Sequence, residues 1–499
     1  MSDNTFDVLI IGAGISGIDS AYRLQEGLPD YSYAILEGRS EIGGTWSLFK
    51  YPGIRSDSDL HTFGFPWDPW KEDRAIADAP SILNYVKNAA ARHGIDKHVR
   101  YSHKVEHMNW SSEQQHWQVD VMVNGSEKKT YYSRFLLLGT GYYDYKEPLQ
   151  SKIPGIENFK GTVVHPQFWP ENLDYADKKV VIIGSGATAV TLLPNMVDKV
   201  KHITMLQRSP GYFLPIPLTE PIDQTIKKFL PESWAYTLIR IRFMIVSFLF
   251  FQFCRLFPKQ GIKLLRKGTE KALPPNIPFD PHFVPKYKPW EQRMCITPGG
   301  DFFDALHTGK ADIVTDTIEA VTANGITLKS GQTLEADIII TATGLKIQFG
   351  GGATVSVDNQ HFLLSQKYTW RGAMLQDLPN FTFVFGYTNA SWTLGADATA
   401  QLWVRILKSM RDKNMTSVVP RMGETEGVLN VPFLNLNSSY ITAAEKDMPR
   451  GGDRGPWKPR TSQGSVELEQ SSVHMSLKGL ARKIILPIRR LDGACPKQA

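Results

Sequence analysis

The chain has 499 residues, 42% of them hydrophobic, a composition that excludes both a disordered chain and a single small core. Its formal net charge of +6 is spread over many lysines and arginines, which argues against a nucleic-acid-binding surface. Three widely separated cysteines, Cys254, Cys295 and Cys495, exclude a disulfide framework, a zinc ribbon and a redox dithiol. We therefore expect a cytoplasmic protein with two or three packed domains and no metal site.

The N-terminal region has the order strand, glycine-rich turn, helix. Residues 1–6 carry no basic run, so no signal peptide is expected. The mostly apolar residues 7–11 suit a buried parallel strand, and a helix is expected around residues 20–24. Between them, Gly12-x-Gly14-x-x-Gly17 is typical of a dinucleotide-binding loop, in which a pyrophosphate approaches the amides at the helix N-terminus.

A carboxylate follows this loop at the distance that such a site requires. Residues 33–36 are expected to form a second strand that ends in Glu37, about 20 residues beyond the loop. A carboxylate at this point binds both ribose hydroxyls of the nucleotide. Glu37 therefore favours a ribose without a 2′-phosphate.

The same order returns later in the chain, with a cation in place of the carboxylate. A strand over 179–183 leads into Gly184-Ser185-Gly186-Ala187-Thr188-Ala189, and a strand over 202–207 ends at Arg208 and Ser209. A cation there suits a 2′-phosphate, which NADP carries and FAD lacks. The alternative, that both charges are ordinary solvated strand ends, requires the same coincidence twice. The two loops therefore predict a flavin oxidoreductase in which FAD takes hydride from NADPH.

The remaining pattern divides the chain into domains. Buried-strand segments at 135–141 and 337–344 end in similar Thr-Gly turns and are expected to mark the crossings between two domains. The predicted fold is α/β, with two Rossmann-like dinucleotide-binding domains and a mainly helical insertion. Its parts are an FAD-binding domain of residues 1–150 and 346–450, an NADP-binding domain of 156–214 and 290–345, the insertion 215–289, and a loosely packed C-terminal tail of 451–499.

One stretch of the insertion suggests contact with a membrane. Residues 243–254 form a largely apolar run flanked by lysines and arginines, inside a helical stretch expected over 232–257. The run is too short to span a bilayer. Two interpretations remain open, a peripheral membrane contact through 240–267 and a helix buried over the substrate pocket.

A resemblance to a known family is carried by Phe159-x-Gly161-x-x-x-His165-x-x-x-Trp169-Pro170, between the two glycine loops. It matches the fingerprint of type I Baeyer-Villiger monooxygenases, which are class B flavin monooxygenases, at every fixed position. Related enzymes that oxidise nitrogen and sulfur usually have an aromatic and a basic residue at 169 and 170. The resemblance covers most of residues 5–450. Within the family, the chain is most similar to the ethionamide-activating subgroup.

The resemblance implies a mechanism and its residues. In this family reduced flavin and oxygen form a C4a-peroxyflavin, which attacks a ketone carbonyl to give an ester or lactone. The resemblance assigns to Arg293 the guanidinium that stabilises the anionic adduct, and to Asp57 the carboxylate that positions it, which is expected to stay ionised. Arg55 and Ser56 match contacts with NADP. The alternatives are a surface ion pair for Arg293 and an ordinary turn residue for Asp57.

The chain keeps further residues of the family pattern and departs from that pattern at two places. Those that match FAD contacts are Ser16, Gly44, Thr45, Trp46 and Val105. His165 is expected to act in a hinge or a hydrogen bond, since the mechanism needs no base there. Gln292 stands where many members have a lysine that helps to bind the 2′-phosphate, so the preference for NADPH depends more on Arg208. Pro456 and Trp457 keep the start of a subgroup motif whose continuation differs.

Three functions remain open on the sequence. The first is oxygenation of a small apolar ketone by O2, and the second is oxygenation of a heteroatom, chiefly sulfur. The third is a non-oxygenating NADPH-dependent reductase or a flavin-binding remnant, which the complete fingerprint and the retained Arg293 and Asp57 disfavour. We therefore expect a monooxygenase that acts on ketones and also on sulfides.

Overall fold

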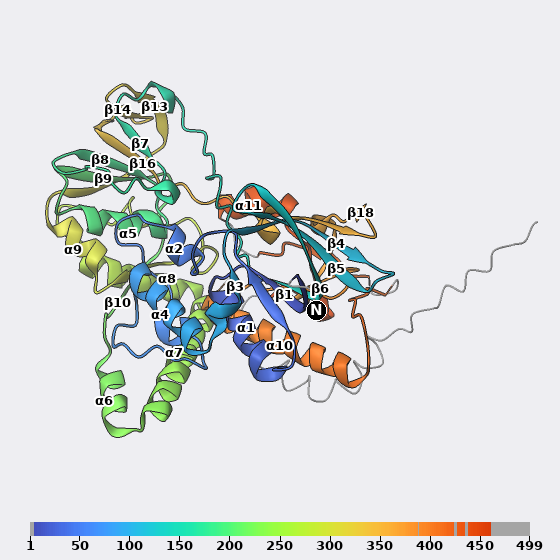
Figure 1. The fold of residues 1–499 in the computed structure, drawn as a ribbon. Coiled ribbons are helices and arrows are strands. Elements are labelled where there is room, and N and C mark those ends of the chain that lie inside the picture. The colour runs from blue at the N-terminus through green and yellow to red at the C-terminus, as the bar shows by residue number, and fades with distance from the viewer. Residues whose placement is uncertain (1–3, 388, 424–426, 435–437, 461–499) are drawn as a thin grey trace, which may run out of the picture.

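A computed structural model describes residues 4–387, 389–423, 427–434 and 438–460. Two separate sheets dominate it, each with a glycine loop at the end of one central strand (Figure 1). The strands next to each glycine loop are parallel, as expected for an α/β nucleotide-binding fold. The predicted fold class is confirmed.

The first sheet has nine strands in the order β18-β17-β4-β5-β6-β1-β2-β3, with β21 also paired to β6. Strands β2, β1, β6 and β21 run parallel to one another, whereas β4, β5 and β6 form an antiparallel meander. The strands are β1 (Thr5–Ile11), β2 (Tyr33–Leu36), β3 (Val99–Arg100), β4 (His103–Ser111), β5 (His116–Val123), β6 (Glu127–Leu138), β17 (Thr354–Val357), β18 (Gln360–His361) and β21 (Phe381–Phe383).

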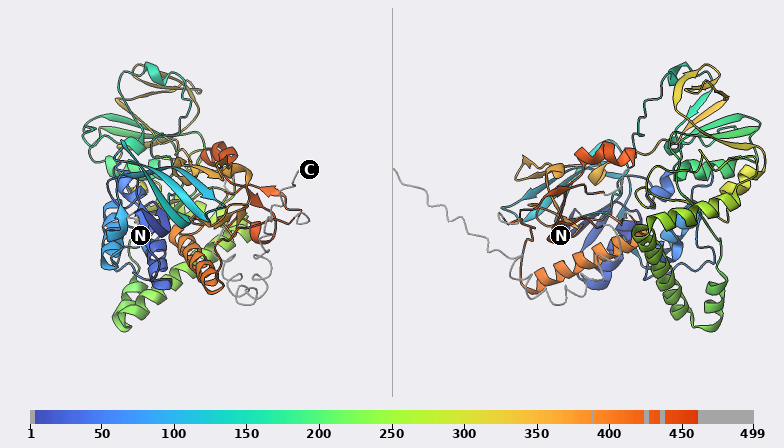
Figure 2. Two further views of the ribbon diagram at one scale, coloured as in Figure 1. Left: turned by 45° about the vertical axis from the view of Figure 1, so that its right-hand side comes forward. Right: turned by 180° about the vertical axis from the view of Figure 1, so that it is seen from behind.

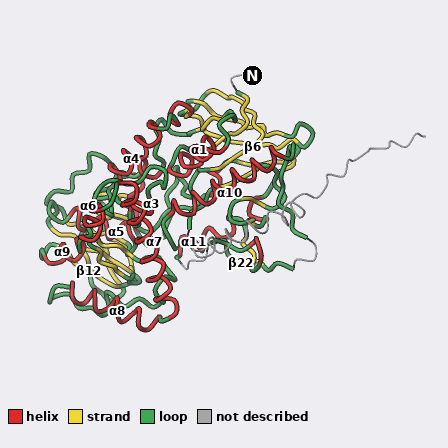
Figure 3. The backbone as a smooth tube through the Cα atoms, turned by 90° about the horizontal axis from the view of Figure 1, so that it is seen from below, coloured by secondary structure: helices red, strands yellow, loops and turns green. Residues whose placement is uncertain are grey.

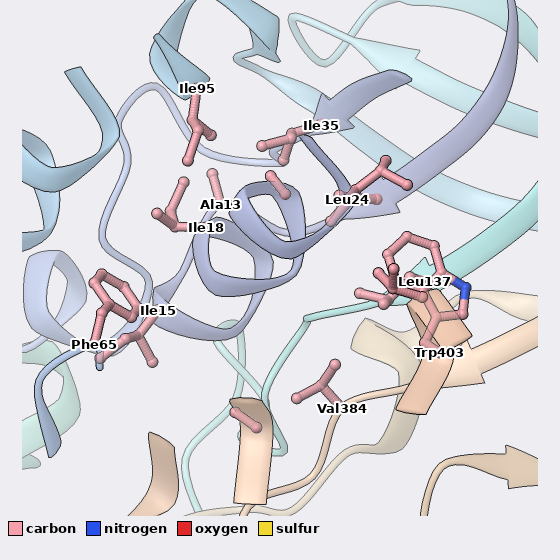
Figure 4. Close-up of a cluster of buried hydrophobic side chains, with 14 of the residues drawn as sticks. Ala13, Ile15, Ile18, Leu24, Ile35, Phe65, Ile95, Leu137, Val384 and Trp403 are labelled. Atoms are coloured by element: carbon pink, nitrogen blue, oxygen red, sulfur yellow. The ribbon is translucent and has the colours of Figure 1, made fainter. Parts of the chain in front are cut away.

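Strand β1 is apolar on both faces because both faces of the sheet are covered. Val8 and Ile10 point into a core that is covered by several helices, and Leu9 and Ile11 point into a second core on the opposite face. Figure 4 shows part of the first core, where Trp403 lies near Leu137. The helices of this part are α1 (Ile15–Gly27), α2 (Thr45–Leu48), α3 (Leu60–Phe63), α4 (Ala79–Arg92), α10 (Trp392–Asp412) and α11 (Ser439–Ala444).

The second sheet has five parallel strands in the order β12-β9-β8-β16-β7. Its strands are β7 (Thr162–Val164), β8 (Lys179–Ile183), β9 (His202–Gln207), β12 (Ala311–Thr315) and β16 (Ile338–Thr341). Helices α5 (Ala187–Met196) and α9 (Asp301–His307) share one core with it. A three-stranded antiparallel sheet packs on its other face and consists of β13 (Ile318–Thr322), β14 (Gly325–Leu328) and β15 (Thr333–Glu335).

The helical insertion leaves the second part through one strand and returns through its neighbour. Strand β10 (Phe213–Ile216) pairs in parallel with β11 (Cys295–Pro298). Between them lie α6 (Pro221–Phe229), α7 (Glu232–Leu256) and α8 (Pro258–Ala272), so the predicted helical stretch of 232–257 is present. The hairpin of α6 and α7 projects from the body of the molecule (Figures 1 and 2). Figure 3, seen from below, shows α7 and α8 in the same half of the molecule as β12, away from β6.

The start of the predicted loose tail is packed, which corrects that part of the prediction. Strand β23 (Gly451–Gly452) pairs with β22 (Asn430–Val431), and Trp457 is 2% exposed in the first core. Burial of its large ring offsets part of the chain entropy that is lost when this segment is ordered. Residues 461–499 lie outside the described residues. Two short strands, β19 (Thr369–Trp370) and β20 (Met374–Leu375), complete this region.

Candidate functional site

A cavity of about 810 Å³ is lined by residues of both glycine-loop units. Its volume is typical of a site for a small molecule or cofactor. The sequence-predicted residues in its wall are Gly12, Gly14, Ser16, Glu37, Gly44, Thr45, Trp46, Arg55, Ser56, Asp57, Val105, Ala187, Thr188 and Arg293. The predicted residues outside its wall are Gly17, Gly184, Ser185, Gly186, Ala189, Arg208, Ser209, Phe159, Gly161, His165, Trp169 and Pro170.

In the first loop, between β1 and α1, each of the three positions is a glycine for a different structural reason. Gly12 has a φ of +99°, and a Cβ there would lie 2.8 Å from the carbonyl oxygen of Gly139. A Cβ on Gly17 would lie 1.9 Å from the carbonyl oxygen of Gly12, so no side chain fits. A Cβ on Gly14 would have the Cα of Gly44 as its nearest atom, at 3.7 Å. Gly14 thus leaves the space through which a pyrophosphate reaches the N-terminus of α1.

The second loop, between β8 and α5, repeats this arrangement. Gly184 has a φ of +141°, and a Cβ there would lie 2.2 Å from the carbonyl oxygen of Ala342. A Cβ on Gly186 would meet no atom within 4 Å, so the N-terminus of α5 is open. Ala189 is fully buried, and its methyl group fits where the first loop requires glycine. The two loops therefore both fit a nucleotide pyrophosphate, at Gly14 and at Gly186.

Glu37 directly follows β2 and ties the first loop to it. Its Oε2 accepts a hydrogen bond of 2.7 Å from the amide of Ala13, and its Oε1 accepts one of 2.9 Å from the amide of Arg39. Burial raises the pKa of Glu37, and these amide hydrogen bonds partly offset that effect. The carboxylate lines the cavity, as expected for a group that binds a ribose.

Arg208 stands at the equivalent point of the second unit, directly after β9. Its side chain is exposed, and within the described part of the chain it has no hydrogen bond or ion pair with another residue. The Ser185 hydroxyl donates a hydrogen bond of 2.8 Å to the carbonyl oxygen of Ser209, which fixes the loop to this strand end. Arg208 is thus available to a ligand, and its contact with a 2′-phosphate stays a prediction.

Arg293 and Asp57 come together in the cavity from segments 236 residues apart in sequence. Both side chains are accessible from the cavity, and protein surrounds them on the other sides. Burial raises the pKa of Asp57, and the charges of Arg293 and Arg55 only partly offset this effect. The pKa of Arg293 is raised further above its ordinary value, chiefly by Tyr142 and also by Asp57. Arg293 is therefore charged at every working pH.

Arg55 and Ser56, the predicted NADP contacts, have protein partners in this structure. Arg55 forms a bidentate ion pair with Asp301, the first residue of α9. This pair joins the first domain to a helix of the second. The Ser56 hydroxyl donates to the carbonyl oxygen of Ser58 at 2.7 Å and closes a tight turn. Contact of Arg55 with NADP therefore requires sharing its guanidinium with Asp301.

The predicted FAD contacts line the cavity on the side of the first sheet. The Ser16 hydroxyl accepts a hydrogen bond of 2.8 Å from Nε1 of Trp392. Thr45 has a side-chain hydrogen bond with Tyr145. Val105 is buried on β4, so it presents little beyond its backbone to a ligand. This wall fits FAD on the first unit.

The fingerprint spans β7 and the turns on either side of it, and its fixed residues lie outside the cavity wall. Nδ1 of His165 accepts a hydrogen bond of 3.2 Å from the amide of Gln167. The side-chain amide of Gln167 then donates at 2.6 Å to the carbonyl oxygen of Asp144, beyond the first sheet's β6. Gln167 lines the cavity, whereas His165 does not. This geometry supports a hydrogen-bonding role for His165 in the connection between the two sheets.

Sequence reasoning missed an aromatic cluster around Arg293. Nη2 of Arg293 donates a hydrogen bond of 3.3 Å to the hydroxyl of Tyr142, which lies 2.8 Å from the hydroxyl of Tyr143. The ring of Tyr142 stacks on Trp392 at 5.3 Å between centroids. A signal was present for the tyrosines, because they directly follow the Thr-Gly turn after a buried strand. No sequence signal marked Trp392, because only the fold brings it to the cavity wall.

Comparison with known proteins agrees with this geometry. The family profile described as pyridine nucleotide-disulphide oxidoreductase matches residues 9–213. The FAD-containing monooxygenase EthA of Mycolicibacterium smegmatis is 46% identical over 454 residues, which are 91% of this chain and 92% of that protein.

Two solved structures share the fold at low sequence identity. OTEMO in complex with FAD and NADP has a TM-score of 0.71 at 19% identity, with 95% of this chain and 98% of that chain covered. The open structure of cyclohexanone monooxygenase has a TM-score of 0.67 at 18% identity, with 84% and 90% covered. The predicted FAD cofactor is confirmed by the family of the relative above, and the OTEMO structure holds both FAD and NADP. The chain belongs to the FAD-containing monooxygenases, and a monooxygenase is what its fingerprint predicted.

Proposed function

We propose that the protein converts small apolar ketones into esters or lactones with NADPH and O2. The observation that supports this most strongly is the position of Arg293, in a cavity lined by both nucleotide units and beside Asp57. When bound and reduced by NADPH, FAD supplies an activated oxygen atom in such a cavity. The residues of this chain must supply everything else that the reaction requires.

The guanidinium of Arg293 stabilises the negative charge that develops on the carbonyl oxygen when the ketone is attacked. A preorganised cation is effective because it needs no reorientation during the reaction. Because its pKa lies far above neutrality, Arg293 does this without releasing a proton. Tyr142 orients the guanidinium through its hydroxyl, and Asp57 adds a compensating negative charge.

An apolar substrate suits the cavity wall next to this group. Phe49, Ile54 and Leu345 form one hydrophobic cluster and line the cavity. Phe49 contacts the ring of Tyr143 edge to face at 6.4 Å, so the cluster adjoins the tyrosines that hold Arg293. An apolar wall with few polar groups is typical of sites for apolar ligands.

Oxidation of sulfides is a second activity that the same site supports, because sulfur needs only the activated oxygen and an apolar pocket. Reduction of a disulfide is disfavoured. Cys254 and Cys295 are both free and buried, and burial raises the pKa of Cys295 to about 12. A thiol with that pKa holds almost no thiolate, which is the reactive species. The third cysteine, Cys495, lies outside the described residues.

The preference for NADPH over NADH is proposed to depend on Arg208, and the protein is proposed to work in the cytoplasm. The guanidinium at the end of β9, which is exposed and forms no ion pair with any described residue, supports the first point. The two buried free cysteines agree with a reducing compartment. The peripheral membrane contact predicted through 240–267 is supported by the exposed apolar residues on the surface of α7.

A panel of ketones and sulfides with product identification tests the proposed reaction. The purified protein is expected to be yellow from bound FAD, to bleach with NADPH under exclusion of oxygen, and to form esters and sulfoxides when oxygen is admitted. Hydrogen peroxide as the sole product across the whole panel would sink the proposal.

A further inference from the structure

Helix α7 has one face packed against the protein and one face exposed along its whole length. On the inner side, Ala235, Ile239 and Cys254 are buried. Nη1 of Arg240 donates hydrogen bonds of 2.7 and 2.8 Å to the carbonyl oxygens of His61 and Gly64. These contacts fix α7 along the first domain. The outer side is therefore the only face of α7 on which a partner can lie.

The outer face is a continuous apolar stripe. Its members lie on one helix face, at spacings of three or four residues and, between the last two, seven, and are Trp234, Leu238, Ile241, Ile245, Leu249 and Leu256. The stripe is about 33 Å long at the rise of an α-helix. Trp234 is 72% exposed and Leu256 is 70% exposed, and Phe229 at the end of α6 is 74% exposed. Isolated exposed apolar residues are common on proteins, but a patch of this extent marks an interaction surface.

The positive charge of the whole chain is concentrated around this stripe. Residues 221–272, which include α6, α7 and α8, contain ten basic and three acidic residues, a net charge of +7. The complete chain has a net charge of +6, so the rest of it carries −1. On α8, Lys259, Lys263 and Lys267 are exposed at four-residue intervals and form no ion pair with any described residue. An apolar stripe beside unpaired cations is complementary to an anionic lipid surface.

Two other arrangements of α7 explain the structure less well. By length and composition, α7 is the one helix among the described residues that is long and apolar enough to cross a membrane. A spanning position would break the contacts of Arg240 and expose the inner face, so the helix fits a position in the plane of the interface. A second copy of the chain would set the exposed lysines of two α8 helices against each other, and that repulsion opposes self-association.

We propose that the outer face of α6, α7 and α8 docks on the surface of a membrane that contains anionic lipids. The apolar side chains enter the boundary between headgroups and acyl chains, and the lysines of α8 contact the headgroup phosphates. Helix α7 is not buried on all sides, because its outer face is exposed. This docking is independent of the proposed oxygenation, since none of the named residues lines the cavity.

Sedimentation of the FAD-loaded full-length protein with vesicles tests the proposal. Vesicles of phosphatidylcholine mixed with phosphatidylglycerol are expected to bind the protein at low salt, and vesicles of phosphatidylcholine alone to bind it much more weakly. The double variant Phe229→Ser, Trp234→Ser is expected to weaken partition by at least about tenfold. Lys259→Gln and Lys263→Gln are each expected to weaken binding to the mixed vesicles by about fivefold.

Leu429→Ser is the matched control, because Leu429 is 64% exposed but lies outside the insertion. It is expected to leave binding unchanged, and the flavin spectrum reports that each variant is folded. Absence of binding to the mixed vesicles at low salt would overturn the proposal, as would variants that bind like the parent. Light scattering that shows a dimer which Phe229→Ser, Trp234→Ser dissolves, together with no vesicle binding, would assign the surface to a second copy instead.

Discussion

The guanidinium of Arg293 is held by the hydroxyl of Tyr142, which accepts its hydrogen bond at 3.3 Å and lies 2.8 Å from the hydroxyl of Tyr143. Arg293 and Tyr142 are 151 residues apart in sequence. The pair brings a residue that follows β6 of the first sheet to one that precedes β11 of the second part. The orientation of the proposed catalytic cation therefore depends on how the two parts pack together.

Tyr142→Phe removes the oxygen that orients Arg293 and leaves the ring stacked on Trp392. Loss of a hydrogen bond to a charged group is expected to lower kcat for ester formation by about tenfold, with the KM for NADPH unchanged. Steady-state kinetics with one ketone measure this. Tyr143→Phe is the control, because that hydroxyl reaches Arg293 only through Tyr142, and it is expected to have a smaller effect. Equal kcat in the Tyr142 variant and the parent would remove the positioning role.

Arg293→Ala is expected to keep FAD and lose oxygenation, because the residue acts on the substrate adduct and not on the adenine. The loss of one preorganised charge from such a site is typically at least about a hundredfold in rate. Flavin absorbance and ester yield are measured on the same sample. Ester yield that matches the parent would exclude Arg293 from the chemistry, and loss of FAD would show that it has a structural role.

The two glycine loops make a steric prediction that separates folding from binding. Gly17→Ala places a methyl group 1.9 Å from the carbonyl oxygen of Gly12, and this clash is expected to destabilise the protein severely. Gly186→Ala meets no atom within 4 Å at a φ of −85°, so this variant is expected to fold and to retain FAD. Its methyl group occupies the space of the nucleotide and should raise the KM for NADPH. Normal NADPH kinetics in Gly186→Ala would contradict the assignment of the second loop.

Arg208→Ala is expected to lower kcat/KM for NADPH by about tenfold or more and to change kcat/KM for NADH little, because only NADPH carries the 2′-phosphate. Lys201→Ala, at the other end of β9, is the control for a general loss of positive charge and should affect neither coenzyme. The ratio of the two kcat/KM values is the measurement. A parallel loss with both coenzymes would contradict the role of Arg208.

His61 gives a prediction for the pH dependence of stability. Burial, reinforced by Lys227 and Arg242, lowers the pKa of His61 to about 4 in the folded protein, whereas its ordinary value is 6.5. Because the unfolded state then binds the proton more tightly, stability falls as the pH drops from 6.5 towards 4. The loss attributable to His61 is about 2 kcal/mol at about pH 5.

Urea unfolding of the parent and of His61→Gln, each at pH 7 and at pH 5, measures this effect. The variant is expected to lose less stability than the parent between the two values, because it has no group to protonate. The same loss in both proteins would assign the acid sensitivity to other groups.

The sequence predicted those features that are set by local patterns. Each glycine loop, with the strand before it and the charge after the next strand, is encoded within about 30 residues, as is usual for a βαβ unit. Glu37 after β2 and Arg208 after β9 were found in this way. The apolar character of β1 also follows directly from its burial on both faces.

Contacts between distant segments were not predictable from these patterns. Trp392 reaches Ser16 across 376 residues, and Arg55 reaches Asp301 across 246 residues, so neither partner is marked in the sequence. Trp457 looked like part of a loose tail because glycine and proline surround it, yet its ring completes the first core. The exposed side of α7 could not be told from a buried one, because apolar residues occupy both faces of the run 243–254.

The most direct test of the central claim, oxygen insertion at a ketone, is a reaction under ¹⁸O2 with NADPH and one apolar ketone, analysed by mass spectrometry of the ester. The protein is expected to give an ester that carries one ¹⁸O atom, and Arg293→Ala is expected to give none while it still oxidises NADPH. Unlabelled ester, or NADPH oxidation by the parent that ends entirely in hydrogen peroxide, would contradict the claim.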